Sequence, residues 1–206
     1  MKTLLNDLHL YELILLFLGV FLFLILSAGL VYYIIKKEEI KKLLLFFPIP
    51  VLMIGYPSIK EITISNDKIA FSKYQEEFIQ NPNDTTAKQK FAKVTEKLES
   101  RVKTPEDIVK ISKAKLLLDK PEEAIKYASR AIDAQTMNSS DTARQGIVNQ
   151  ATQLKNLAQI QNTDINKVSK EAFKQELHNI QVSDDLEALK KTVARKTLEK
   201  YRKRAN

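Results

Sequence analysis

An uninterrupted apolar run near the start of the chain is the strongest hydrophobic pattern in this sequence. Uncharged, mostly apolar residues extend from Leu13 to Ile35. At ~1.5 Å per residue, a helix of this length reaches about 34 Å, which exceeds a hydrocarbon core of ~30 Å. Tyr11 stands before the run, and Tyr32 and Tyr33 stand near its end, where aromatic rings favour the membrane interfaces. We therefore predict a transmembrane helix over 13–35.

Two other structures can produce an apolar run, a buried core helix and a cleaved signal peptide. A core helix normally keeps a polar face, and this run has none. A signal peptide has an apolar region of only ~7–15 residues, followed by small residues at the cleavage site. The small residues 27–29 are followed by more membrane-like sequence, Leu30 to Ile35. We therefore expect an uncleaved membrane anchor.

A second uncharged run, from Leu43 to Ile59, is at the lower length limit for a spanning helix. It contains residues that interrupt helices, and each interior proline removes a backbone donor. These are Pro48, Pro50, Gly55 and Pro57. Two interpretations stay open, a second spanning helix and a re-entrant segment. We favour a transmembrane helical hairpin, with residues 1–59 as the anchor and 60–206 as a soluble domain.

Positive charge in the link between the two runs predicts the orientation. Cytoplasmic loops are enriched in lysine and arginine, so the link is expected in the cytoplasm and the N-terminus outside it. If the second run spans, residues 60–206 lie on the periplasmic side of an inner membrane. If it is re-entrant, they are cytoplasmic. The link carries four lysines, Lys36, Lys37, Lys41 and Lys42.

Residues 60–206 show helical periodicity and few turn residues. Gly146 is the only glycine in this region, whereas strands and hairpins usually need more. Apolar residues recur every three to four positions, which is the spacing of one helix face. A short strand over Glu61–Ser65 is a weaker alternative. We predict an all-α domain with helices near 66–80, 85–102, 105–119, 121–135, 140–161, 164–180 and 183–204.

Helix start signals agree with this periodicity. Thr104 to Asp107 places a capping hydroxyl, a proline and two acidic residues in the order typical of a first turn. Asp119 to Glu123 repeats that order. Three further starts are suggested by Ser139 or Ser140 with Asp141, by Thr163 with Asp164, and by Ser183 with the acidic pair after it.

The stretch from Leu116 to Ala134 resembles the second half of a tetratricopeptide repeat. Ala124, Ala128 and Ala131 have the 0, +4, +7 spacing that such repeats use for close helix packing. The family usually carries a large aromatic where Ala128 stands, and its closing proline, tryptophan and glycine are absent here. The resemblance covers one copy over about residues 105–135, without a second copy at the ~34-residue period.

This resemblance implies a scaffold of stacked helices with a groove that binds a protein partner. In this sequence the groove is expected near Ile111, Leu118 and Tyr127.

Charge is concentrated at the end of the chain. Residues 190–206 carry eight basic residues against Glu199 alone, which is +7 of the net charge of +8. This segment is either the solvated end of a helix or a tail that docks on an anionic surface. If the segment lies outside the cytoplasm, that surface is an acidic protein or an envelope polymer. If it lies in the cytoplasm, the surface is anionic lipid or, less favoured, nucleic acid. The basic residues are Lys190, Lys191, Arg195, Lys196, Lys200, Arg202, Lys203 and Arg204.

Catalytic chemistry has little support in the sequence. The chain has no cysteine, and its two histidines, His9 and His178, are far apart in sequence. Metal-binding, phosphate-loop and nucleophile motifs do not appear. The paired carboxylates at 122–123 and 184–185 stand where helices begin, which explains them structurally. We expect no catalytic residue, no cofactor and no metal, and therefore no enzyme.

The function predicted from these features is a membrane-anchored helical scaffold of the cell envelope, which tethers a protein partner. Tethering raises the effective concentration of a weak partner without chemistry. Two alternatives stay open: an accessory subunit of a transport or secretion complex, and a cytoplasmic-facing adaptor whose basic tail binds anionic lipid or nucleic acid.

Overall fold

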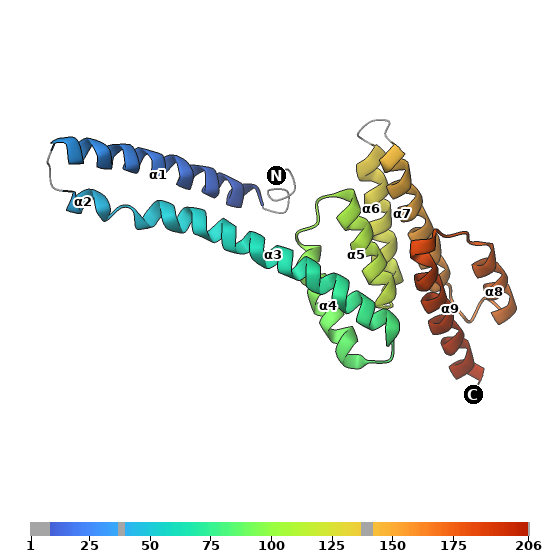
Figure 1. The fold of residues 1–206 in the computed structure, drawn as a ribbon. Coiled ribbons are helices and arrows are strands. Elements are labelled where there is room, and N and C mark those ends of the chain that lie inside the picture. Colours follow the sequence, from blue (N-terminus) through green and yellow to red (C-terminus); the bar gives the residue numbers. More distant parts are fainter. Residues whose placement is uncertain (1–8, 37–39, 137–141, 206) are drawn as a thin grey trace. The chain divides into compact units, whose positions relative to one another are not determined.

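The computed structural model describes residues 9–36, 40–136 and 142–205 (Figure 1). Within these ranges the regular structure is α-helical and contains no strand, which confirms the all-helical prediction; Glu61–Ser65 is helical as well. The helices are α1 (Leu10–Lys36), α2 (Lys41–Leu44), α3 (Pro48–Gln80), α4 (Thr85–Glu99), α5 (Pro105–Leu117), α6 (Pro121–Thr136), α7 (Thr142–Gln161), α8 (Lys170–Asn179) and α9 (Asp184–Ala205).

Side-chain caps mark the starts of α4, α5 and α8. Thr104 accepts a hydrogen bond from the backbone N–H of Asp107 at 3.2 Å, as the start signal predicts. One predicted start is wrong, because α8 begins at Lys170 and not near 164. Asp164 accepts the N–H of Asn166 at 2.9 Å and so stabilises a turn, whereas Ser169 caps α8.

The chain divides into two compact units, Met1–Ile69 and Ala70–Asn206. The division falls inside α3, and the predicted boundary after residue 59 therefore lies within a continuous helix. The first and second units are described separately below.

In the first unit, α1 and the beginning of α3 run antiparallel and approach closely at Gly19. A Cβ atom on Gly19 would lie 2.9 Å from the Cβ of Met53 and 2.9 Å from the Cγ1 of Ile54, so a larger residue would force the helices apart. The rings of Phe23 and Phe47 meet edge to face, with centroids 5.8 Å apart. Glycine at position 19 therefore permits the contact between these helices.

The second apolar run differs from its prediction. It does not form a separate helix over 43–59: its first residues belong to α2 and a turn, and the rest is joined to the predicted 66–80 helix in α3. Pro48 and Pro50 lie in the first turn of α3, where backbone N–H groups have no partner within the helix, so they open the helix and do not break it. Among the described helices, only α1 is long and apolar enough to cross a membrane.

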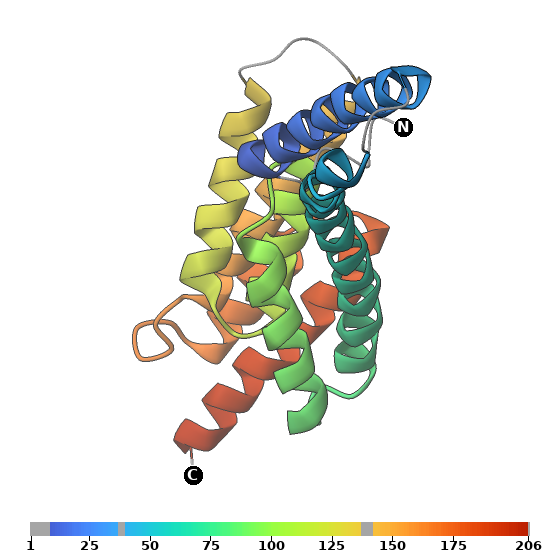
Figure 2. The ribbon, with the colours of Figure 1, turned by 90° about the vertical axis from the view of Figure 1, so that its left-hand side faces the viewer.

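In the second unit, α5 is the central helix, with α4, α6, α7 and α9 packed against it (Figure 2). Leu116 and Leu117 are fully buried. The α6 side chains that meet α5 and α7 are small, since Ala124, Ala128 and Ala131 are fully buried. The hydroxyl of Ser112 donates to the carbonyl of Ala124 at 2.8 Å across the α5–α6 contact.

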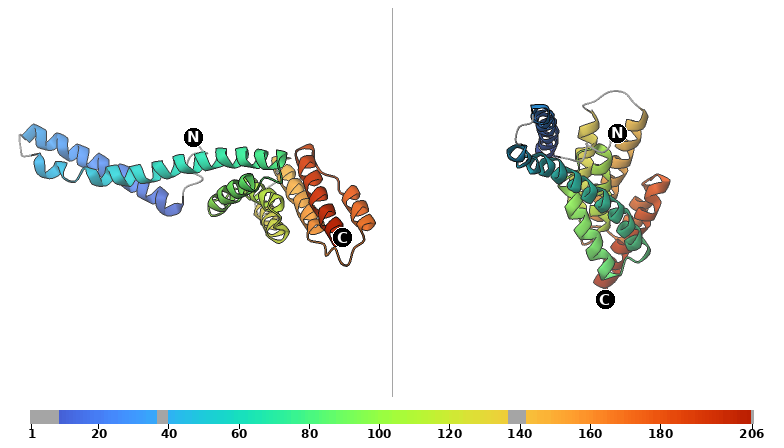
Figure 3. Two further views of the ribbon diagram at one scale, coloured as in Figure 1. Left: turned by 90° about the horizontal axis from the view of Figure 1, so that it is seen from below. Right: turned by 60° about the vertical axis from the view of Figure 1, so that its left-hand side comes forward.

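Aromatic side chains join the outer helices to this centre. Phe71 and Phe78 of α3 lie with ring centroids 5.3 Å and 6.0 Å from that of Phe91 on α4. At the other side of the unit, Phe173 of α8 contacts Tyr201 of α9, at a centroid distance of 5.7 Å. Figure 3 shows α8 lying beside α9.

The end of α5 has an unusual residue at its left-handed position. Asp119 has φ 66°, a conformation that normally favours glycine. The N–H of Lys120 bonds to the carbonyl of Lys115 at 2.9 Å, and the N–H of Asp119 bonds to that of Leu116 at 3.2 Å. The Asp119 carboxylate also accepts from Gln161 at 2.8 Å and Lys200 at 3.2 Å. One side chain therefore ties the end of α5 to α7 and α9.

We expect Asp119→Ala to lower the free energy of unfolding by about 2 kcal/mol, because alanine keeps the left-handed strain and loses the carboxylate acceptor. Asp119→Gly relieves the strain and should recover part of this loss. The measurement is urea unfolding of the full chain in uncharged detergent, followed by circular dichroism. Equal stability of wild type and Asp119→Ala would contradict this role.

Candidate functional site

The residues predicted to lie at the membrane interface are at the ends of α1 and in α2. Tyr11 and Tyr32 are exposed, Tyr33 is half-buried, and the Lys36 ammonium lies 5.0 Å from the centre of the Tyr32 ring. Lys41 is exposed in α2. The predicted Lys37 lies outside the described residues, as does the side chain of Lys42.

Between these ends, α1 presents apolar side chains that the described part of the first unit leaves exposed. Phe21 is 62% exposed and Leu24 is 60% exposed. Only 6% of the most apolar stretch of the helix is buried. Such a surface is unfavourable in water and favourable in hydrocarbon.

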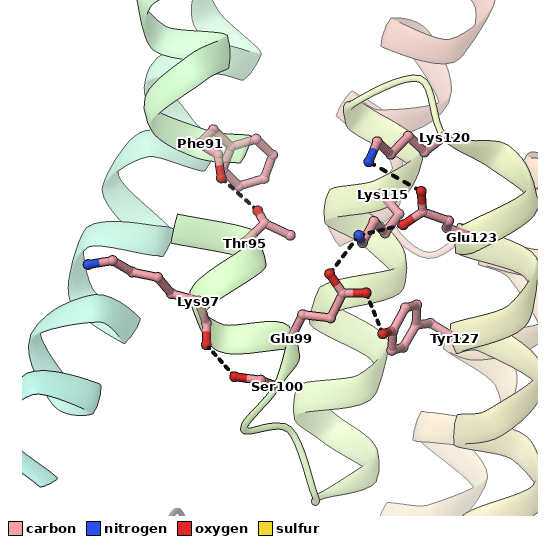
Figure 4. A network of polar contacts seen from close by, with 9 residues as sticks. All are labelled: Phe91, Thr95, Lys97, Glu99, Ser100, Lys115, Lys120, Glu123 and Tyr127. Atoms are coloured by element: carbon pink, nitrogen blue, oxygen red, sulfur yellow. Dashed lines mark hydrogen bonds and ion pairs between the residues drawn. The ribbon is translucent and has the colours of Figure 1, made fainter. Parts of the chain in front are cut away.

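A buried ammonium group lies at the junction of α4, α5 and α6 (Figure 4). The Lys115 side chain is 4% exposed, and its Nζ lies 2.7 Å from Glu99 and 2.5 Å from Glu123. The hydroxyl of Tyr127 donates to the other oxygen of Glu99 at 2.5 Å. Lys120 adds a second cation 3.2 Å from Glu123. Each of the three helices contributes at least one member, so the network fixes how they pack.

The pKa values of these groups follow from burial and pairing. Burial raises the pKa of Glu99, but hydrogen bonds from Lys115 and Tyr127 and the Lys115 charge outweigh it, so the net shift is downward. The hydrogen bond from Lys115 is the main cause of the lowered pKa of Glu123. Burial lowers the pKa of Lys115, and its two glutamates reverse this into a net increase. Burial, together with the bond to Glu99, raises the pKa of Tyr127 to about 12.

The residues predicted to form a partner groove have different surroundings. Ile111 is 1% exposed and Leu118 is 8% exposed, so in this conformation both side chains face the core. Tyr127 is half-buried, and its hydroxyl is bound within the network. That these three residues form a groove stays a prediction.

The basic segment 190–206 is not a free tail, because through Ala205 it forms most of α9. Leu189 and Val193 are buried, and Tyr201 is buried with its hydroxyl 3.0 Å from the carbonyl of Val168. Four of the eight basic side chains also bond within the second unit. Lys190 donates to the carbonyl of Ile180 at 2.6 Å, Lys200 pairs with Asp119, Lys196 donates to Leu117 and Arg204 to Ile165.

The other four cations of α9 are exposed. Lys191, Arg195 and Arg202 fall at i, i+4 and i+11, which places them on one side of the helix. Lys203 lies on a different side. An anionic surface that docks on this side of α9 would therefore meet the first three residues and not all eight.

The two histidines occupy separate helical regions. His9 directly precedes α1, and its backbone N–H donates to the carboxylate of Glu12 at 2.8 Å. His178 is exposed on α8. Among the described residues, no three histidine or acidic side chains converge as metal ligands would.

Sequence reasoning missed Lys115 and Asp119. The available signal for Lys115 was its place between Ala114 and Leu116, at the start of an apolar stretch of α5. For Asp119 it was a helix end without glycine, followed by Pro121. Neither signal predicts which residues Lys115 and Asp119 bind, because those partners come from other helices.

No known protein family, no curated protein and no solved structure matches this chain.

We expect Lys115→Met to lower the free energy of unfolding by roughly 3 kcal/mol at pH 7. This is the low end for removing one member of a buried pair, because the glutamates keep partial contact with water. Urea unfolding of the full chain in uncharged detergent measures it. An effect as small as that of the exposed control Lys93→Met would contradict the network's role.

The stabilisation by this network should also depend on pH. It is complete between the ordinary glutamate pKa of 4.5 and the ordinary tyrosine pKa of 10.0. Below 4.5 it declines, because the glutamates have lowered pKa values in the folded state and must then be protonated. Above 10.0 it declines towards about 12, because the folded state keeps Tyr127 neutral while the unfolded state ionises. Lys115 has a raised pKa in the folded state, so its own contribution is lost as pH rises above its ordinary pKa of 10.5. Because of the glutamates at low pH and Lys115 at high pH, the stability difference between wild type and Lys115→Met should shrink at both extremes; a constant difference would argue against this assignment.

Proposed function

We propose that this protein is a membrane-anchored helical interaction protein that tethers a protein partner and has no catalytic activity. The exposed apolar surface of α1 is the observation that carries this proposal. Burying a helix of this composition in lipid removes from water the side chains that the protein itself leaves uncovered. A core helix of a soluble protein would have its apolar side chains covered.

The anchor in this proposal is a helical hairpin of α1 and the first part of α3. The close approach at Gly19 supports it, since small residues allow membrane helices to pack closely. The first-turn prolines of α3 are compatible with this hairpin, because they do not break the helix. Beside Pro57, the Ser58 hydroxyl donates to the carbonyl of Ile54 at 2.9 Å. The lysine-rich link then faces the cytoplasm, and the second unit lies on the periplasmic side of an inner membrane.

The second unit is proposed as the partner-binding part. Its α5–α6 pair packs through the three alanines that resemble a tetratricopeptide repeat, a family of protein-binding scaffolds. The ion network of Lys115 stabilises that pair against α4. A tethered rigid scaffold raises the local concentration of its partner, and this is the whole mechanism we propose.

A cytoplasmic-facing adaptor is the second candidate function. It is favoured by α3, which is less apolar than a spanning helix requires, and by the exposed cations on one side of α9. In that case the second unit lies in the cytoplasm, and these cations meet anionic lipid.

Cysteine labelling distinguishes the two orientations, because the native chain has no cysteine. We expect Gln175→Cys, exposed on α8, to react with a membrane-impermeant maleimide in spheroplasts, whereas Lys41→Cys in α2 reacts only after lysis. If position 175 also reacts only after lysis, as position 41 does, the cytoplasmic adaptor would replace the periplasmic scaffold.

Partner capture distinguishes a scaffold from an accessory subunit that works through its membrane helices. We expect the second unit to retain the partner of the full chain after residues 1–59 are deleted. The measurement is affinity purification of both forms followed by mass spectrometry, with circular dichroism to show that the shortened form is folded. Loss of the partner from a folded shortened form would favour the accessory subunit.

A further inference from the structure

A cavity of about 240 Å³ in the second unit collects more positive than negative charge. It lies between the α3–α4 turn and α9, and Phe78 and Asn83 form part of its wall. Five cationic side chains and two carboxylates line it: Lys88, Arg195, Lys196, Lys200 and Lys203, with Asp119 and Glu199.

The carboxylates do not neutralise this cavity. Five cations against two anions leave a net charge of +3. Asp119 already accepts hydrogen bonds from Gln161 and Lys200. Burial lowers the pKa of Lys196. The charge of Asp119 opposes this shift, but the nearby charges of Lys88, Lys200 and Arg195 add to it, and the net shift is downward. The cations therefore repel one another, and a bound anion would relieve that repulsion.

Two kinds of cation are present. Lys196 is held in place, because its ammonium donates to the carbonyl of Leu117 and lies 5.0 Å from the ring centre of Phe78. Lys88, Arg195 and Lys203 are exposed and make no hydrogen bond or ion pair within the described part of the chain. The cavity thus has a fixed positive floor and three side chains free to bind a ligand.

We infer that this cavity binds a compact phosphate-bearing anion, of about the size of a diphosphate. A phosphate group carries more than one negative charge, and its oxygens accept several charge-assisted hydrogen bonds. Such a group therefore matches three cations around one cavity better than a single carboxylate does. The volume lies below the ~300–1,000 Å³ typical of sites for larger organic ligands. This site is independent of the proposed membrane anchor and of the protein partner.

The phosphate has two sources, a soluble diphosphate and the headgroup of an anionic lipid. Isothermal titration calorimetry of the full chain in uncharged detergent, at constant ionic strength, tests both with separate titrants. These are inorganic pyrophosphate and a short-chain, water-soluble phosphatidic acid. Saturable binding of pyrophosphate supports a soluble ligand, and saturable binding of phosphatidic acid alone supports a lipid headgroup.

Paired variants show whether binding occurs in the cavity. Lys88→Gln with Lys203→Gln removes two free cations from its wall, and we expect the affinity to fall at least about tenfold. The matched control, Lys93→Gln with Lys191→Gln, removes the same charge from α4 and α9 outside the cavity and should bind like wild type. Circular dichroism checks that both variants fold.

Two results would overturn the inference. One is the absence of saturable binding of either titrant to the wild-type protein. The other is an equal loss of affinity in the two folded double variants, because general attraction to a basic protein would then account for binding.

Discussion

Helix α5 has to bury most of its surface, because α4, α6, α7 and α9 all pack against it. That constraint places a lysine where water cannot reach it, and an isolated ammonium there would be very costly. Glu99 from α4 and Glu123 from α6 offset the desolvation free energy of the Lys115 ammonium by binding it from two sides. Tyr127 satisfies the remaining oxygen of Glu99. The packing of the second unit and its polar network therefore depend on each other.

The same burial explains why α9 is structural as well as basic. The carbonyl of Leu117 at the end of α5 accepts from Lys196, and Asp119 beyond that end accepts from Lys200. The apolar residues of α9 pack beside α7 and α8. Tyr201 of α9 forms a buried cluster there with Ile160 of α7 and Phe173 of α8. Cations fixed in this way cannot leave to meet a distant surface. They can form the floor of a local anion site, and this is how the cavity beside Lys88 arises.

The first unit follows a different constraint. Its principal helix leaves large apolar side chains exposed, and that arrangement is unfavourable in water. Gly19 allows α3 to approach α1 closely. The exposed aliphatic surface is the physical basis of the proposed anchor, and the helices of the second unit provide the proposed scaffold.

Local patterns in the sequence determined the helical class, the apolar segment of α1 and most of the helix starts. Caps such as Thr104 act on residues three positions away, and helical periodicity repeats within two turns, so both are readable without the fold. They failed where local signals were ambiguous: Asp164 forms a turn, and the prolines at the start of α3 permit one long helix. Only the tertiary structure decided that Lys115 is buried, that Asp119 adopts a left-handed conformation and that cations of α9 line one cavity with Lys88. Their partners lie far away in the sequence, and packing alone brings such residues together.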